Sequence, residues 1–297
     1  ISLHTQERKA NDAFRAKRAL LTAYFGRNAD GDNATAKQIA DHVLESGVQG
    51  DNRSYFFSLF AKARLRLGES DPAITLLKTA LDINPTNVSA FKRLALELLH
   101  RQQPLAVIAL IDELSEYRVV HARLLALKML ALAAMDNQAE ARAVLGAEFS
   151  VHSSVIDLPP AWPDQVAFHA ALANEIWNNE GRRFERYGTS SERSWRVDHP
   201  ATGNTPAVAA LMAEILRIAL AHAASVTQHK HEWAAACTPS AILRSWCVIA
   251  DGDGYEKWHM HPEGWMSGGY YVEVPDAVAN GSDEAGCLMF GLPGGLI

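Results

Sequence analysis

The sequence predicts a multidomain α+β protein in which an all-helical segment precedes a segment that contains strands. Residues 1–152 are rich in Ala and Leu, and their apolar residues recur at helical spacing. A proline-dense stretch from Leu158 to Pro163 breaks this pattern, and a β-favouring aromatic run, Tyr270-Tyr271-Val272, lies near the C-terminus. We therefore expect helical repeats at 1–152, a linker at 153–163 and a second domain at 164–297.

The helical segment repeats with a period of about 34 residues, which is clearest from Ser54 to Asn87. Small residues in this unit allow two antiparallel helices to approach closely, and Asn84-Pro85 ends the second helix. Further units are predicted on both sides of it. Their second helices are expected at Ala34 to Leu44 and at Pro104 to Leu114, and a looser unit is expected at Ala122 to Leu145.

The pattern of large and small packing residues and the closing proline resembles the tetratricopeptide repeat. The positions that carry the resemblance are Phe57, Ala61, Ala73, Leu77, Ala80 and Pro85. The resemblance implies an α-solenoid that holds a protein or peptide partner, and the alternative is that the repeats pack against the second domain or mediate self-association. The charged residues of these helices are predicted to form a solvated face: Lys62, Arg64, Arg66, Lys92 and Arg93.

The second segment is predicted to begin with helices and end with strands. Gln165 to Asn178 and Ala207 to Ser225 have helical periodicity, and the second of these helices is expected to back a sheet. Thr189 to Pro206 is polar and punctuated by Gly and Pro, which favours a loop. Asp251 to Gly254 is typical of a hairpin turn between two strands.

Two histidines one residue apart, His259 and His261, precede the aromatic run. In an extended segment, side chains two residues apart point to the same face, so both imidazoles would be presented together. Such a pair suits Fe(II), Zn(II), Cu or Ni, and an iron site of the facial-triad type needs one more ligand and open positions. The alternative is a pair of ordinary surface histidines. His229 and His231 have the same spacing without a β-rich run after them, and they are predicted to lie on the surface.

The residues from Leu243 to Val274 resemble the first half of the catalytic core in a bacterial family of 2-oxoglutarate- and Fe(II)-dependent oxygenases. The resemblance lies in Trp246, a Gly-containing turn, the HxHP motif and the run Ser267-Gly268 to Val272. It implies an incomplete double-stranded β-helix, or jelly roll, with flanking helices, and Fe(II) and 2-oxoglutarate as cofactors.

The resemblance also implies roles for single residues. His259 corresponds to the first iron ligand, and His261 falls where most relatives carry a carboxylate. Glu263 is the alternative carboxylate, because His261-Pro262-Glu263 also reads H-x-E. Tyr270 and Ser267 are predicted to contact the co-substrate, and no catalytic residue is predicted beyond the metal ligands.

In the family, a distal His and a basic residue for the 2-oxoglutarate carboxylate lie well downstream, whereas no His, Arg or Lys follows His261 here. The chain also opens with Ile1. We therefore expect a chain truncated at both ends, inactive by itself although its full-length form is a dioxygenase. The alternative function is a non-catalytic tetratricopeptide scaffold with a cupin-like binding module.

Composition narrows the remaining classes of function. The net charge of −6 argues against a nucleic-acid partner. The three cysteines are too few and too widely spaced for a disulfide framework, so they are predicted to be free thiols in a reducing compartment. We find no apolar stretch of about eighteen residues and no signal peptide, which predicts a cytoplasmic protein without membrane contact.

Overall fold

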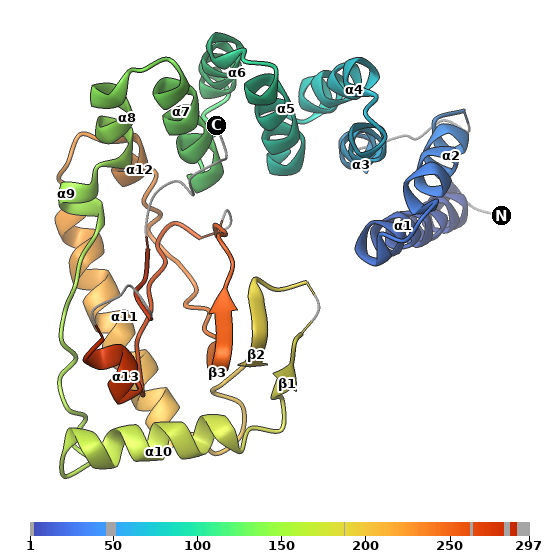
Figure 1. The fold of residues 1–297 in the computed structure, drawn as a ribbon. Coiled ribbons are helices and arrows are strands. Elements are labelled where there is room, and N and C mark those ends of the chain that lie inside the picture. The colour runs from blue at the N-terminus through green and yellow to red at the C-terminus, as the bar shows by residue number, and fades with distance from the viewer. Residues whose placement is uncertain (1–2, 46–51, 187, 262–263, 282–285, 290–297) are drawn as a thin grey trace. The chain divides into compact units, whose positions relative to one another are not determined.

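The computed structural model describes residues 3–45, 52–186, 188–261, 264–281 and 286–289 (Figure 1). These residues divide into two compact units, one ending at Val144 and one beginning at Leu145. Helices dominate, and the described residues also form one three-stranded antiparallel sheet. The predicted α+β composition is confirmed, while the tetratricopeptide and jelly-roll architectures stay predictions.

The first unit is built from consecutive helices joined by short turns, and each helix contacts the next one within α3 to α7. Helix α3 also contacts α5, and α5 contacts α7. The helices are α1 (Leu3–Arg27), α2 (Asp32–Glu45), α3 (Asn52–Arg66), α4 (Ser70–Ile83), α5 (Val88–His100), α6 (Pro104–Glu116), α7 (Ala122–Ala134) and α8 (Gln138–Leu145), which crosses the boundary between the units.

Small and aromatic residues fill the core of the first unit as the period predicted. Ala61, Ala73 and Ala80 are fully buried, so α3 and α4 approach closely. Phe56 and Phe60 stack edge to face with centroids 5.4 Å apart, one turn from each other on α3. The aromatic pair therefore lies on α3, and the buried residues Ala73 and Ala80 lie on α4, which packs against it.

A buried polar network fixes the register of α3, α4 and α5. Asn87 is the N-cap of α5 and accepts from the backbone N–H of Ala90 (3.0 Å). Its Nδ2 donates to Ser54 Oγ (2.8 Å), and that hydroxyl donates to the carbonyl of Ala80 (2.7 Å). Asn87 and Ser54 are both fully buried, so each bond replaces one that water would otherwise make.

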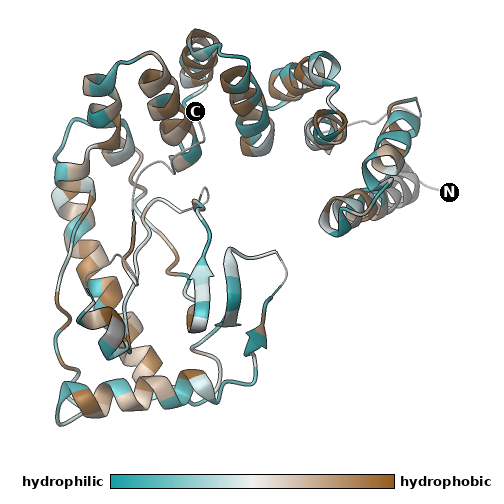
Figure 2. Cartoon of the chain, in the orientation of Figure 1, coloured by the Kyte–Doolittle hydropathy of each residue, from teal (hydrophilic) through white to brown (hydrophobic). Residues whose placement is uncertain are grey.

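The second unit places two long helices against the sheet. Its elements are α9 (Ala147–Ser150), α10 (Gln165–Trp177), β1 (Arg183–Phe184), β2 (Ser191–Val197), α11 (Pro206–Val226), α12 (Glu232–Ala235), β3 (Cys247–Glu256) and α13 (Asp276–Ala279). The strand order is β1-β2-β3. Phe168 and Leu172 of α10, Val208 of α11 and Val197 of β2 share one core, and Figure 2 shows hydrophobic residues along both helices. Helix α11 therefore backs the sheet as expected.

The segment predicted as a linker is part of this core. Ile156 is buried in it, and Leu158 and Trp162 pack against it. Proline-dense chain can pack in an irregular conformation where its apolar side chains find a hydrophobic surface.

The central strand was missed by the sequence interpretation, which made Thr189 to Pro206 a loop. This prediction is wrong, because β2 pairs with both β1 and β3. Its inward residues include Ser191 and Ser194, and its polar sequence hides the alternation that marks a half-buried strand. Arg193, with a φ of 48°, interrupts the register and adds to the irregularity.

The hairpin turn predicted at Asp251 to Gly254 is also wrong. These residues lie within β3, at the irregularity of the β2–β3 ladder between Ala250 and Tyr255. A Cβ on Gly254 would come within 2.7 Å of the Arg193 carbonyl oxygen, so the strands can approach here only because residue 254 is glycine.

Helix α11 is long and apolar enough to cross a membrane by length and composition alone, a feature that the sequence interpretation overlooked. Its Ala207, Val208 and Leu211 are buried in the core of the second unit. The α11 N-terminus is held by Glu175 of α10, whose carboxylate accepts from the backbone N–H groups of Ala207 and Val208, both at 2.9 Å.

Candidate metal centre

The predicted metal ligands follow the end of β3 directly. Antiparallel pairing sets Ser191 of β2 opposite Glu256, and the N–H of Lys257 donates to the carbonyl of Ser190 (2.9 Å). After Lys257 the chain leaves the sheet and passes His259 and His261 in an irregular conformation. The strand expected here is not formed, because no strand of the described residues pairs with 257–261 or 264–275.

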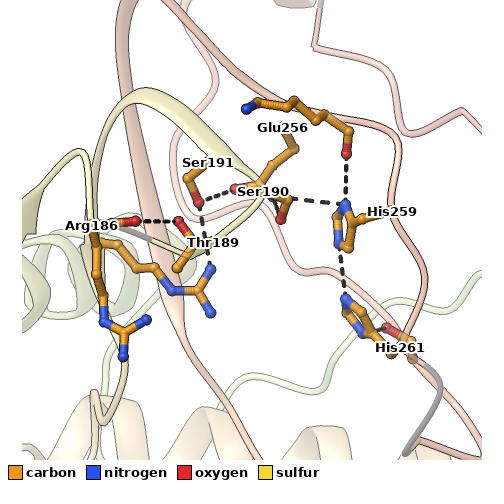
Figure 3. A network of polar contacts seen from close by, with 10 residues as sticks. Arg186, Thr189, Ser190, Ser191, Glu256, His259 and His261 are labelled. Carbon is orange, nitrogen blue, oxygen red and sulfur yellow. Dashed lines mark hydrogen bonds and ion pairs between the residues drawn. The ribbon is translucent and has the colours of Figure 1, made fainter. Parts of the chain in front are cut away.

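The two imidazoles nevertheless face each other. Their Nε2 atoms are 2.9 Å apart and their ring centroids are 4.8 Å apart. Figure 3 shows the two rings side by side, so the imidazoles converge although the segment that carries them is not part of a strand.

Each histidine has its other ring nitrogen held from outside the pair. His259 Nδ1 lies 2.7 Å from the carbonyl oxygen of Lys257, which can only accept, so Nδ1 carries the proton and Nε2 keeps its lone pair. His261 Nδ1 lies 2.9 Å from Ser267 Oγ, which can donate or accept. Such outer partners set the tautomer and orientation of metal-binding histidines.

The spacing of the Nε2 atoms fits neighbouring positions around a six-coordinate metal. Two nitrogens at about 2.1 Å from a metal and about 90° apart are separated by about 3.0 Å, and a tetrahedral angle would separate them by about 3.4 Å. The observed 2.9 Å is close to the first value, and it is also the length of a direct hydrogen bond between the two rings. The geometry therefore allows His259 and His261 to bind one ion together and does not identify that ion.

A carboxylate stands behind His259. Glu256 Oε2 is 4.0 Å from His259 Nδ1, on the side away from His261. Both hydroxyls of the neighbouring serines donate to this carboxylate, that of Ser190 to Oε2 at 2.5 Å and that of Ser191 to Oε1 (Figure 3). Glu256 is thus fixed by β2, where its negative charge favours binding of a cation by the adjacent imidazole.

A reciprocal tryptophan pair holds the chain just after the histidines. Trp233 of α12 and Trp265 stack with centroids 4.7 Å apart. Each indole N–H donates to the backbone carbonyl of the other residue, at 2.6 Å from Trp233 and 2.8 Å from Trp265. This pair ties the irregular segment to a helix and so takes the place of the missing strand pairing.

The guanidinium of Arg196, on β2, lies close to the two histidines. The Arg196 guanidinium lies 5.0 Å from the ring centroid of Trp246, and that ring lies 5.0 Å from the ring of His261. Arg196 Nε also bonds Asp198 Oδ1 (2.8 Å). Partial burial, followed by the charges of His259 and Arg196, lowers the pKa of His261, which keeps its imidazole neutral and able to bind a metal.

The structure places the other predicted site residues in different surroundings. Ser267 contacts His261, as described above, and the Tyr270 hydroxyl lies 2.6 Å from His169 Nε2 of α10. Their roles toward the co-substrate stay predictions. Glu263 lies outside the described residues, and within the described part of the chain no group of three or more His, Cys, Asp and Glu side chains could hold a metal.

The sequence interpretation missed Arg196, because it searched for a basic residue only downstream of His261. No local pattern indicated this residue, because the polar segment around Trp195 was expected to form a loop. Once this segment is a strand paired with β3, Arg196 lies opposite Val248 and close to the histidines.

Comparison with known families found one match, which covers the segment that contains the two histidines. Residues 244–294 match the model of a family described as "Putative 2OG-Fe(II) oxygenase". That family uses Fe(II) and 2-oxoglutarate, and the matched segment contains both histidines. No curated protein and no solved structure matched the chain.

Proposed function

We propose that this chain carries the iron-binding part of a 2-oxoglutarate- and Fe(II)-dependent oxygenase. The observation that carries the proposal is the 2.9 Å approach of the Nε2 atoms of His259 and His261, with both Nδ1 atoms bound elsewhere. The family match over 244–294 supports the choice of iron among the metals that imidazole pairs bind.

When bound, Fe(II) with 2-oxoglutarate supplies the oxidising chemistry, which ends in hydroxylation of a substrate. The protein's own part is to hold and orient. His259 and His261 occupy neighbouring coordination positions, Ser267 and the Lys257 carbonyl fix their rings, and Glu256 adds negative charge behind the first ligand.

We assign the co-substrate's carboxylate to Arg196. A guanidinium binds a carboxylate through two parallel N–H donors, and Arg196 lies one aromatic ring away from His261. Its side chain is only 12% exposed, which strengthens its attraction to a bound anion. Asp198 orients the guanidinium through Nε (2.8 Å), and Nη1 makes only a long contact with Ser191 Oγ (3.5 Å), which a bound carboxylate would replace.

We further infer that the helix pairs of the first unit hold a polypeptide partner, which would be either the substrate or a protein that delivers it. The supporting observation is the run of packed helices from α3 to α7 with the small-residue pattern of a tetratricopeptide repeat.

The test is anaerobic calorimetry of 2-oxoglutarate binding with and without Fe(II). We expect 2-oxoglutarate to bind only when Fe(II) is present, since it chelates the metal, and we expect Arg196→Gln to weaken this binding on the order of tenfold. Arg217→Gln on α11 is the matched control, because it removes the same charge and Arg217 pairs with Asp157 and Glu214. Binding of 2-oxoglutarate that ignores Fe(II) contradicts the proposal.

The alternative of a non-catalytic scaffold with a cupin-like module is favoured by one observation, the lack of a third ligand near the histidines within the described residues. Fe(II) binding without any succinate formation from 2-oxoglutarate would support this alternative. Succinate formation that His259→Ala abolishes would exclude it.

A further inference from the structure

Four basic residues lie on two helices of the first unit that contact each other, α3 and α5, whose positions Figure 1 shows. Lys62 and Arg66 are one turn apart on α3, and Lys92 and Arg93 are adjacent on α5. The two helices are in contact, and Arg93 Nη1 reaches across to donate to Ser58 Oγ (2.6 Å) on α3. We call Lys62, Arg66, Lys92 and Arg93 the basic face.

Aromatic and neutral groups hold two of these cations in place. Lys62 Nζ lies 4.4 Å from the ring centroid of Phe25 on α1, and Arg66 Cζ lies 5.2 Å from the same centroid. Arg66 also donates to the carbonyl of Phe25 (3.1 Å). These contacts orient the cations and leave their charge in place.

Within the described residues, none of the four cations of the basic face forms an ion pair. Arg64, which belongs to the same helix α3, shows the contrast, because it pairs with Asp41 at 2.8 Å and with Glu69 at 2.6 Å. Acidic side chains are therefore close to one side of α3 and are not paired with the basic face.

The electrostatics confirm that the cations repel one another. Burial, followed by the charges of Arg66, Arg93 and Lys92, lowers the pKa of Lys62 to about 8. Burial, followed by Arg123 of α7 and Arg66, lowers the pKa of Arg93 to about 10. Every charged neighbour that shifts these two groups is a cation.

The solvated face predicted from the sequence is therefore only partly correct. Arg66 and Lys92 are exposed, but Lys62 and Arg93 are half-buried. Half-buried charges of the same sign destabilise a fold. The whole chain carries a net charge of −6, so the excess of positive charge on the basic face is local and is not a general property of the protein.

We propose that the basic face binds an acidic segment of a partner polypeptide in an extended conformation. Neighbouring packed helices lie about 8–10 Å apart, and an extended chain in the polyproline II conformation has about three residues per turn and advances about 3.1 Å per residue. Carboxylates three residues apart then lie on one side of the chain, about 9 Å apart, and match cations on α3 and α5. A single small anion would reach only part of this set. The proposal rests on the partner role proposed for the helix pairs and is independent of the iron centre.

The experiment measures fluorescence anisotropy of a short labelled peptide with Glu at every third position and Ser elsewhere. The companion probes are the same peptide with Gln in place of Glu, and an oligothymidylate of equal length. The test variant is Lys62→Gln/Lys92→Gln, which leaves the Arg93–Ser58 bond intact. The control is Arg101→Gln on α5, whose charge is already paired with Asp71 and Glu97.

We expect the Glu peptide to bind in preference to the Gln peptide, with affinity falling steeply as salt rises. The double variant should lose on the order of tenfold in affinity while its thermal midpoint stays equal or rises, because repulsion is relieved. The control should bind as the unmodified chain does.

Three results would overturn the proposal: equal binding of the Glu and Gln peptides, unchanged affinity in the double variant, or tighter binding of the oligothymidylate. Equal binding of the two peptides would still leave a partner role for the helices, whereas failure of both peptides to bind would count against that role as well. If the double variant fails to fold, the affinity of the unmodified chain for the Glu peptide is measured at several salt concentrations. A steep fall with salt supports the proposal, and an affinity that does not change with salt contradicts it.

Discussion

The candidate metal site depends on single groups that contact the Nδ1 atoms of two histidines. His259 Nδ1 is hydrogen-bonded to a backbone carbonyl, which a side-chain substitution cannot remove. His261 Nδ1 is hydrogen-bonded to the Ser267 hydroxyl at 2.9 Å. The two rings therefore differ in how far a side-chain substitution can disturb them. Ser267, predicted from the sequence as a co-substrate contact, contacts the ring of His261 in the structure, and its role toward the co-substrate stays a prediction.

Replacement of the Ser267 side chain should weaken metal binding without unfolding the protein. We expect Ser267→Ala to lower Fe(II) affinity by about 10- to 100-fold, because the His261 ring loses its outer partner. Anaerobic calorimetry measures the effect, and Ser225→Ala, at an exposed position of α11, is the control. Unchanged affinity in Ser267→Ala would show that the hydroxyl does not orient the ligand.

A second residue-scale prediction concerns the buried amide that joins three helices. Asn87→Ala should lower the free energy of unfolding by about 1–3 kcal/mol, because the α5 cap is lost and Ser54 keeps only its bond to Ala80. Asn178→Ala at the exposed end of α10 should change it by less than about 0.5 kcal/mol. Chemical denaturation compares the two, and equal effects would refute the role of burial.

At the scale of elements, the path from β3 to the histidines depends on close approach of two strands. Gly254 is the residue that permits it, since a Cβ would come within 2.7 Å of both the Arg193 carbonyl oxygen and Ser194 Oγ. The same strand ends at Glu256, so a shift at residue 254 would move the carboxylate behind His259.

Gly254→Ala should therefore reduce stability by about 1–3 kcal/mol and also weaken Fe(II) binding. Gly268→Ala is the matched control, because a Cβ there meets nothing within 4 Å and it also lies close to the histidine pair in sequence. Thermal unfolding and metal titration of both variants check the prediction. If Gly254→Ala binds Fe(II) as tightly as the unmodified chain does, the close approach of the two strands is not needed for metal binding.

Helices could be predicted from the sequence and the central strand could not, for a physical reason. The helices α4, α6 and α11 carry long apolar periodicities with proline at or near their first turns, which are local signals. Strand β2 instead buries Ser191 and Ser194 and pairs with strands far away in the sequence. Strand β2 forms because it pairs with β3, and no local sequence pattern predicts this pairing.

The candidate site divides in the same way. The spacing of His259 and His261 is local, so the pair could be predicted, although the rings meet in an irregular segment and not on a strand. Arg196, Glu256 and Trp233 reach the site through the sheet and α12. Their proximity is a property of the fold, which residue spacing alone does not contain.

At the scale of the whole molecule, stability should depend on pH through a half-buried histidine. His121 caps α7, where its Nδ1 accepts from the N–H of Leu124 (2.9 Å). Burial, followed by the charge of Arg123, lowers its pKa from 6.5 to about 4. Between these values the unfolded chain binds more protons than the folded one, so the free energy of unfolding falls as pH falls.

We expect this loss to be on the order of 1–2 kcal/mol between about pH 6.5 and pH 4, after allowance for the partial exposure of the ring. His121→Asn keeps a capping side chain and removes the titration, so its stability should vary less over this range. Denaturation at several pH values measures both proteins. Ion-paired carboxylates such as Asp32 and Asp198 also have lowered pKa values, and they lose their contribution only below about pH 4.

The most direct test of the account is anaerobic calorimetric titration with Fe(II) of the unmodified chain, His259→Ala and His261→Ala. The geometry predicts one Fe(II) site in the unmodified chain and its loss in both variants, with thermal midpoints unchanged because the histidines lie outside the cores. Fe(II) binding that survives in both variants, or that is absent from the unmodified chain, would contradict the histidine pair as the metal centre.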